Sequence, residues 1–371
     1  MDRAWIDGQP ATSDEALDAA AKLLADAVQP FVGGLRTDVA GLRAAFALAK
    51  DLGAIVDHAD SATIEPFLSA LRDGGAFLAA PAEMRRRADR VLVLGDEPAT
   101  IGADLLTSLS TSEPDLGVRT RGSGRQIMVL GTVAGPVEGH DGVTRIDCAS
   151  DDLVDVVGMV RARLAGRPIG EGPLGGTTIA TIAEFVAAAG FGCIVFSPAE
   201  VGALGSEQVF GLAADLNAET RCSTLPLLGS DNAMGAALLS TWTAGFPLRL
   251  SFGRREAEHD AALYASDRQL SGAGEADCAV IVDALADGAA AAAPAVALPA
   301  IVLAADPAAA KAAQIGFAVA SAGRDHDSIL YDSRFGSFVG QTAQESSELP
   351  TAAAILTALA ERLGGRVADA A

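Results

Sequence analysis

The sequence is poor in cysteine, histidine and aromatic residues, which excludes several kinds of site. Its 371 residues include only four cysteines, four histidines, two tryptophans and two tyrosines. The cysteines (Cys148, Cys193, Cys222 and Cys278) form no CxxC pair, and the histidines are equally scattered. A disulfide framework, a structural zinc site or an iron–sulfur cluster needs such residues at close spacing, so none is expected. Cys193 and Cys278 lie in apolar runs, where a thiol behaves as a small buried hydrophobic group.

Basic residues are also few relative to acidic ones. Lysine and arginine together number 27 against 48 aspartates and glutamates, and the formal net charge is −21. A chain of this charge repels phosphate backbones, so nucleic acid is not expected as a partner. The same charge keeps an alanine-rich protein in solution, so acidity alone identifies no ligand.

Targeting and membrane segments are not evident either. The first fifteen residues contain no basic stretch followed by an apolar run, which argues against a secretory signal. A membrane span needs about twenty consecutive apolar residues. The nearest case, residues 286–305, is interrupted by Pro294 and Pro299 and predicts a loop followed by a buried strand. We therefore expect a cytoplasmic protein with no membrane contact.

Common catalytic and nucleotide-binding motifs are missing. The sequence has no GxxxxGK[ST] run and no GxSxG elbow. The glycines at 33–34 follow a predicted strand but lack the GxGxxG spacing, and those at 122–124 precede a strand, so both predict turns. Ser61, Ser230 and Ser251 have no histidine whose position argues for activation of a nucleophile. We expect no catalytic residue.

The sequence does contain short apolar runs that alternate with amphipathic helical segments. Runs of strand length occupy residues 30–34, 54–57, 90–95, 125–131, 191–196, 247–252, 278–282 and 300–305. Helical periodicity occupies residues 13–27, 38–52, 61–72, 151–165, 178–189 and 206–217. Continuous apolar strands separated by helices indicate parallel sheets covered on both faces. The fold class is therefore α/β, with two doubly wound, mostly parallel-sheet domains.

Local signals place some boundaries. Thr12 or Ser13 is the expected N-cap of the first helix, and Gly53 is the expected stop of the second. The basic run 84–90 predicts the C-terminal end of a helix, with docking of an acidic partner as the alternative. The Gly/Pro-rich stretch 165–178 predicts the boundary between a first domain, 1–165, and a second domain, 166–371.

Two loops combine residue types that packing alone does not require. Residues 91–99 (VLVLGDEPA) combine a strand, a glycine, two carboxylates and a proline, as is typical of the ligand-facing end of a strand. Residues 225–260 mix glycines, an asparagine, a Trp–Phe pair and adjacent arginines without one continuous period. Loops of this kind are functional more often than cores are, so we expect a ligand cleft or a subunit interface.

These segments resemble the B subunit of the formylmethanofuran dehydrogenases, which belong to the wider molybdopterin oxidoreductases. The most specific match is TAGFPLRLSFGRRE (243–256), joined by residues 215–235, 31–59 and 83–99. The resemblance covers about residues 10–350. It implies the fold of the central domains of molybdopterin oxidoreductases, without their N-terminal iron–sulfur domain.

The chain departs from the active members of that family at two points. They begin with a cysteine-rich segment, whereas no cysteine precedes Cys148, and they carry a cysteine or selenocysteine metal ligand where this chain has Thr63. A threonine hydroxyl is not a soft ligand for molybdenum or tungsten. The resemblance therefore implies that the metal, the pterin and the cluster are lost, so no cofactor is expected. The vestigial cofactor cleft maps to Thr63, Gly95, Asp96, Pro98, Gly229, Ser230 and Asn232.

One branch of the family fits this pattern, the B subunit of the bacterial formyltransferase/hydrolase complex of methylotrophs. That complex serves formaldehyde oxidation by moving a formyl group from tetrahydromethanopterin to a methanofuran-like carrier and releasing formate. The resemblance implies a non-redox scaffolding subunit. Its expected partners are an amidohydrolase-like formyl hydrolase subunit, a formyltransferase subunit and one further subunit. Two alternatives stay open: a molybdopterin- or nucleotide-binding oxidoreductase subunit, and a free-standing binding protein.

Overall fold

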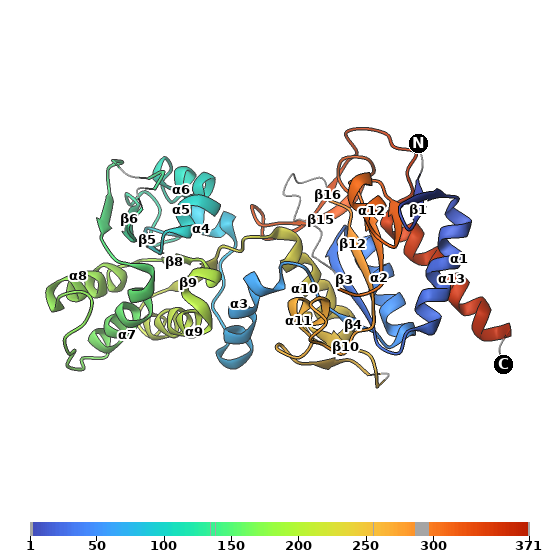
Figure 1. Cartoon of the computed structure of the whole chain (residues 1–371). Helices are drawn as coiled ribbons and strands as arrows, with labels where there is room; N and C mark the ends of the chain where they lie inside the picture. The colour runs from blue at the N-terminus through green and yellow to red at the C-terminus, as the bar shows by residue number, and fades with distance from the viewer. Residues whose placement is uncertain (1–2, 134, 138, 255, 286–296, 370–371) are drawn as a thin grey trace. The chain divides into compact units, whose positions relative to one another are not determined.

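The chain forms two compact units in the computed structural model (Figure 1). The structure describes residues 3–133, 135–137, 139–254, 256–285 and 297–369. Unit 1 comprises residues 1–62, 230–332 and 338–371, and unit 2 comprises residues 63–229 and 333–337.

This division corrects the predicted domains 1–165 and 166–371. The stretch 165–178 lies inside unit 2, where it connects two helices that pack together, α7 (Leu153–Leu164) and α8 (Gly176–Ala187). Its glycines and prolines form a loop between neighbouring helices, because such residues mark a turn whether or not a domain ends there.

Unit 1 is built on a mixed sheet, which has nine strands in the described residues, in the order β11-β10-β4-β3-β12-β13-β14-β1-β2. The strands are β1 (Ala4–Ile6), β2 (Gln9–Ala11), β3 (Pro30–Arg36), β4 (Ile55–Val56), β10 (Leu250–Ser251), β11 (Glu258–His259), β12 (Cys278–Asp283), β13 (Ala300–Ala304) and β14 (Ile315–Ala318). The central strands from β4 to β14 run parallel and are almost wholly buried. The two strands at each edge pair antiparallel. The continuous apolar runs of the sequence correspond to this parallel centre.

The helices of unit 1 begin and end at identifiable signals. They are α1 (Ser13–Asp26), α2 (Val39–Leu52), α10 (Asp231–Ala244), α11 (Ser266–Leu270), α12 (Pro307–Ala312) and α13 (Ala352–Asp369). Thr12 caps α1 in a capping box with Glu15, which confirms the predicted N-cap. Asp38 caps α2 through the Gly41 N–H, and Gly53 ends α2 in the left-handed conformation. Helix α13 packs against both α1 and α2 (Figure 1).

Unit 2 is built on a wholly parallel sheet in the order β7-β6-β5-β8-β9. Its strands are β5 (Arg90–Leu94), β6 (Gln126–Leu130), β7 (Val143–Ile146), β8 (Gly192–Phe196) and β9 (Cys222–Pro226). Besides α7 and α8 its helices are α3 (Ser61–Gly74), which begins in unit 1, α4 (Pro81–Arg87), α5 (Glu97–Ile101), α6 (Ala103–Ser110) and α9 (Pro198–Leu216). Figure 1 shows α4, α5 and α6 on one side of the sheet and α7, α8 and α9 on the other. The α/β class is confirmed, and the sheet of unit 1 departs from the expectation only at its antiparallel edges.

Other expectations can be compared with the structure. All four cysteines are buried and free, and burial raises the pKa of Cys222 and Cys278 to about 12. The predicted strand at 247–252 shrinks to the two residues of β10. Residues 286–296 of the predicted loop lie outside the described residues, whereas the buried strand that follows is β13. In the part of the chain described, no helix has both the length and the apolar character that crossing a membrane requires.

A bulge in β3 sets up the carboxyl end of the sheet of unit 1. Gly34 and Leu35 both have positive φ, 73° and 56°, and the pairing of β3 with β12 shifts register there. A Cβ added to Gly34 would lie 2.6 Å from the Val282 carbonyl oxygen. Only glycine combines this φ with so close an approach of the neighbouring strand. The shift brings Arg36 opposite Asp283.

We expect Gly34→Ala to lower the free energy of unfolding of unit 1 by about 3 kcal/mol, because strain and overlap add. The matched control is Gly272→Ala. This glycine has a similar φ of 77°, but the nearest atom to an added Cβ is that of Ala297 at 3.9 Å. The control should lose only about 1 kcal/mol. Urea unfolding followed by tryptophan fluorescence measures both, since Trp5 and Trp242 lie in unit 1. Equal losses would show that β12 makes no close contact with Gly34.

Candidate functional site

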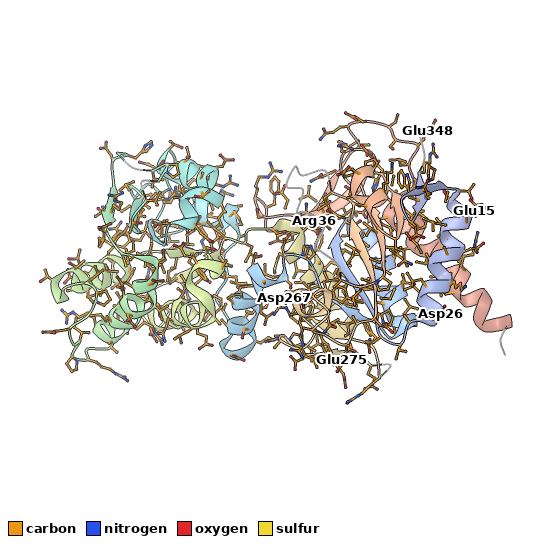
Figure 2. The ribbon with its side chains drawn as sticks, in the orientation of Figure 1. Glu15, Asp26, Arg36, Asp267, Glu275 and Glu348 are labelled. Atoms are coloured by element: carbon orange, nitrogen blue, oxygen red, sulfur yellow. The ribbon has the colours of Figure 1, made fainter. Side chains whose placement is uncertain are left out.

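The carboxyl ends of the parallel strands of unit 1 hold a buried ion pair. The strand order reverses direction between β3 and β12, the position at which doubly wound sheets bind ligands. Here the last residues of the two strands meet, and Arg36 Nε donates to Asp283 Oδ1 at 3.0 Å. The Arg36 side chain, which Figure 2 labels, is only 8% exposed and also lies 3.6 Å from Asp60 Oδ2. A guanidinium thus occupies the ligand position of this sheet.

Arg36, Asp60 and Asp283 form a charged cluster, and a series of hydrogen bonds through His58 extends it. His58 follows β4 and is fully buried, and burial lowers its pKa, so its ring is neutral. Its Nδ1 accepts from the Asp60 N–H at 2.9 Å, and therefore its Nε2 donates to Asn232 Oδ1 at 2.6 Å. Asn232 Nδ2 in turn donates to the Thr37 carbonyl oxygen at 2.8 Å. One tautomer of His58 and one orientation of Asn232 satisfy every step, so this network joins the ends of β3 and β4 to the start of α10.

Asp57 is the second buried charged group of the cluster. Its Oδ2 accepts from Ser61 Oγ and from the Ser266 N–H, both at 2.7 Å, and lies 3.8 Å from Arg249 Nε. Its Oδ1 is buried and has no partner among the described residues. Desolvation by burial raises the pKa of Asp57 from its ordinary value of 3.8 to about 6, against the opposing effects of Ser61, Arg249 and Ser266. A buried carboxyl of this kind holds a proton more tightly than an exposed one.

Arg249 reaches this cluster from a strained backbone. Leu248 and Arg249 have φ values of 60° and 47°, which non-glycine residues rarely adopt. Surrounding groups hold them: the Leu248 N–H donates to Ser240 Oγ, His259 Nδ1 lies 3.0 Å from the Leu248 carbonyl oxygen, and the Asp260 N–H donates to the Arg249 carbonyl oxygen. Strain of about 1–3 kcal/mol per residue persists only where the surroundings enforce it. This turn lies within residues 243–256, the most specific part of the resemblance.

In unit 2 the strand order reverses direction between β5 and β8. At this position, the switch point of the sheet, a carboxylate lies in place of the guanidinium of unit 1. Glu200, in the first turn of α9, accepts from the Asp96 N–H at 2.8 Å, the Glu97 N–H at 3.0 Å and Ser150 Oγ at 2.5 Å. A Cβ added to Gly95 would lie 2.1 Å from Glu200 Oε2, so only glycine admits this carboxylate. Backbone N–H groups after a parallel strand are the donors that commonly receive a phosphate.

Asp96 accepts hydrogen bonds from the corresponding backbone N–H groups after the neighbouring strand, β6. It accepts from the Thr132 N–H at 2.7 Å, Thr132 Oγ1 at 2.5 Å and the Val133 N–H at 2.9 Å. Burial alone would raise the pKa of Asp96, but these hydrogen bonds outweigh it and lower the pKa. A pterin dinucleotide would need such donors for its phosphates and would meet the charges of Asp96 and Glu200. The residues of unit 2 therefore do not fit that group.

The seven predicted cleft residues fall into separate groups. Gly95, Asp96 and Pro98 gather at the carboxyl end of β5, where Pro98 is buried in α5. Asn232 belongs to the His58 network of unit 1, and other predicted positions nearby in the sequence have structural roles. Ser230 caps α10 through the Ala233 N–H, Gly229 ends the long segment 63–229 of unit 2, and Thr63 lies in the first turn of α3. Among the described residues no group of three or more His, Cys, Asp or Glu side chains could hold a metal ion.

Sequence reasoning missed several residues that build these clusters. Arg36, Asp57, His58, Arg249 and Glu200 were not singled out, although the first three directly end or follow buried strands. That position was the available signal, because side chains at carboxyl ends of parallel strands converge. Of the serines considered as nucleophiles, Ser61 instead donates to Asp57.

The two units define a class of protein: doubly wound α/β units in which the chain's own charged side chains fill the switch points. The chain belongs to the family formed by the B subunit of the formyltransferase/hydrolase complex. It is 38% identical over 279 residues to the B subunit of the formyltransferase/hydrolase complex Fhc of Methylorubrum extorquens, covering 75% of this chain and 73% of that protein. This identity confirms the resemblance noted in the sequence.

Further comparisons agree with this assignment. A chain in the X-ray crystal structure of the formyltransferase/hydrolase complex (FhcABCD) from Methylorubrum extorquens, in complex with methylofuran, matches with a TM-score of 0.87 and 33% identity. That match covers 98% of this chain and 99% of that chain. The B subunit of the tungsten-containing formylmethanofuran dehydrogenase 2 is 26% identical in Methanococcus maripaludis and 25% in Methanocaldococcus jannaschii. Both matches span 249 residues, 65% of this chain and 57% of the archaeal proteins. No family model matches the chain.

The raised pKa of Asp57 predicts a pH dependence of stability. Between pH 3.8 and about 6 the folded chain binds more protons at Asp57 than the unfolded chain. The contribution of Asp57 to the free energy of unfolding is therefore fully present below pH 4 and is lost as the pH rises through 6. The loss amounts to roughly 3 kcal/mol, since one pKa unit corresponds to about 1.4 kcal/mol.

Asp57→Asn should remove this component when urea unfolding is measured from pH 4 to pH 7 by tryptophan fluorescence. Relative to the wild type, the variant should gain stability as the pH rises. Asp26→Asn, at an exposed position of α1, is the control and should follow the wild type. Parallel pH curves for the wild type and Asp57→Asn would show that Asp57 titrates normally.

Glu200 supports a second test. Replacing it with alanine leaves the Asp96 and Glu97 N–H groups without their acceptor, so we expect unit 2 to lose about 2–4 kcal/mol of stability. Hydrogen exchange of a peptide spanning residues 94–101 should become faster. Glu207→Ala, an exposed substitution on the same helix, is the control and should leave that exchange unchanged. Unchanged exchange in Glu200→Ala as well would mean that the carboxylate does not hold these amides.

Proposed function

We propose that this chain is the B subunit of a formyltransferase/hydrolase complex in one-carbon metabolism, with a structural rather than a redox role. The observation that carries the proposal is the match to the chain in the complex from Methylorubrum extorquens. It covers 98% of this chain and 99% of that chain at a TM-score of 0.87, so the two folds correspond over almost their whole length. Agreement of this extent supports the same role in the same kind of assembly.

The proposed complex moves a formyl group from tetrahydromethanopterin to a methanofuran-like carrier and releases formate in the cytoplasm. The proposed partners of this chain are an amidohydrolase-like formyl hydrolase subunit, a formyltransferase subunit and one further subunit. This chain contributes no catalytic residue. It supplies two rigid α/β units whose surfaces position the partners.

The same proposal holds that the chain binds no molybdenum or tungsten pterin and no iron–sulfur cluster. The support is chemical. Glu200 and Asp96 already take the backbone donors at the carboxyl ends of β5 and β6. In unit 1, Arg36 and Asp283 pair at the switch point. Thr63 stands where the resemblance places the metal ligand, and its hydroxyl is a poor ligand for either metal.

The two units then correspond to the central domains of the molybdopterin oxidoreductases, with their cofactor function replaced by internal pairing. The 26% identity to the tungsten-containing subunit of Methanococcus maripaludis supports this common origin. It also favours the second candidate, an oxidoreductase subunit that retains a pterin or a nucleotide. That candidate requires a ligand to displace the carboxylates of Asp96 and Glu200 from their hydrogen bonds.

Purification of the protein from its native cells tests the proposal. We expect the hydrolase and formyltransferase subunits to co-purify in constant ratio by mass spectrometry, and molybdenum and tungsten to be far below one atom per chain. The archaeal tungsten-containing subunit, purified from its own cells, is the positive control for the metal analysis. A stoichiometric metal and pterin would establish the oxidoreductase instead. A monomer without partners would establish a free-standing binding protein.

A further inference from the structure

Unit 1 carries a surface pocket that takes no part in the buried clusters. It has a volume of about 680 Å³ and lies between α2, the last turn of α10 and the segment after β10. Phe46, Trp242 and Phe252 provide its apolar surface. Its charged lining consists of Arg43, Lys50 and Glu256. The pocket is thus apolar in the middle and mainly cationic at its margin.

The wall that α2 contributes has a regular pattern. Arg43, Ala47 and Lys50 are all exposed and lie at spacings of four and three residues, so they form one stripe along the helix. The small Ala47 side chain sits between the two long cationic ones. A partner side chain can therefore approach the helix backbone at Ala47 with a cation on either side.

The opposite wall presents an exposed tryptophan. Trp242 is 59% exposed, although its ring packs against the Phe338 ring at a centroid distance of 5.1 Å. Leaving so large an apolar surface in water is unfavourable, and tryptophan and arginine are the residues most enriched among those that dominate binding energy at protein interfaces. A tryptophan fixed on one side and open on the other offers a preformed contact surface.

The charge of the pocket contrasts with the rest of the chain. The net charge is −21, and exposed carboxylates lie on several elements of unit 1 (Figure 2). These are Glu15, Asp26, Asp267, Glu275 and Glu348. Despite this excess of acid, Arg43 and Lys50 have no ion-pair partner within the described part of the chain. Two unpaired cations beside an apolar hollow are complementary to a surface that supplies carboxylates.

We propose that this pocket is the docking site for a polypeptide segment of a partner subunit. The segment inserts an apolar side chain between Ala47 and Trp242 and places carboxylates opposite Arg43 and Lys50. The inference rests on the proposed function, because the partner is a subunit of the same complex. It adds to that function the surface of this chain and the chemistry of the segment that binds it.

Binding of the purified full-length chain to its separately purified partner subunits tests the proposal by biolayer interferometry. Trp242→Ala should weaken binding to one partner at least about tenfold, as expected for an interface anchor. The double substitution Arg43→Glu, Lys50→Glu should weaken it by a similar factor and should abolish the loss of affinity that added salt causes in the wild type. Both cations are exposed, so this variant keeps the fold if Trp242→Ala does not.

Two substitutions outside the pocket are matched controls. Val28→Ala removes another exposed apolar side chain of unit 1, and Lys22→Glu reverses another exposed cation on α1. Both should bind within about twofold of the wild type, as surface changes outside an interface do. Hydrogen exchange should show protection of residues 39–50 and 241–254 in the complex.

The outcomes separate the two claims. If the wild type binds a partner and the pocket variants bind it equally well, the docking inference is overturned while the proposed function stands. If protection appears only elsewhere on the chain, the inference is likewise overturned. If the wild type binds none of the partner subunits, the proposed function fails and the docking inference fails with it.

Discussion

The pairing of Arg36 with Asp283 joins two strands whose residues are 247 positions apart in the sequence. A buried guanidinium is stabilising only when carboxylates stand close to it, and here Asp60 and Asp283 do. Asp60 also donates its N–H to His58, so the loop after β4 is tied to the same ion pair. The register shift at Gly34 brings Arg36 to this point. The ion pair thus connects the ends of β3 and β12 to the loop after β4 and, through His58 and Asn232, to the start of α10.

In unit 2 a negatively charged side chain lies at the equivalent position of the sheet. At its switch point, Glu200 takes the donors that follow β5, as Asp96 takes those that follow β6. Each unit therefore fills with its own side chains the position at which its fold ordinarily receives a ligand. The strained turn at Leu248 and Arg249 persists in unit 1 because the surrounding hydrogen bonds enforce it. These internal hydrogen bonds fix the loops at the carboxyl ends of the strands, in keeping with the structural role proposed for the chain.

Much of the local structure could be predicted from the sequence, because its signals are local. Thr12 and Gly53 mark helix ends by their own hydrogen bonds and conformations, and the apolar runs mark the parallel strands. Helix α10 was missed because its buried residues, Ala233, Ala236, Ala237, Leu239 and Ser240, lie around more than one face. The short strands β1 and β2 have too few residues for a pattern to show.

The long-range features could not be predicted in this way. The division into units depends on the pairing of β3 with β12, and no local pattern records a contact across so many residues. The buried clusters likewise combine residues from distant segments. Within residues 57–67 only Ser61 and Thr63 were considered. Ser61 was set aside as a nucleophile, and the resemblance directed attention to a missing ligand at Thr63 and away from the carboxyl and imidazole groups of Asp57 and His58.

The interrupted course of unit 1 also governs the order in which the chain can fold during synthesis. Nearly all of unit 2 is one continuous segment, residues 63–229, so it can fold as soon as it leaves the ribosome. Strand β3 emerges before it, but its partner β12 follows about 240 residues later. At translation rates of about 5–20 residues per second, β3 waits on the order of 10–50 s for that partner. During this interval β3 has only β4 to pair with, and its edge toward β12 stays unpaired. Unpaired strand edges and exposed apolar surface are prone to aggregation, so this N-terminal segment is the most exposed to that risk during synthesis.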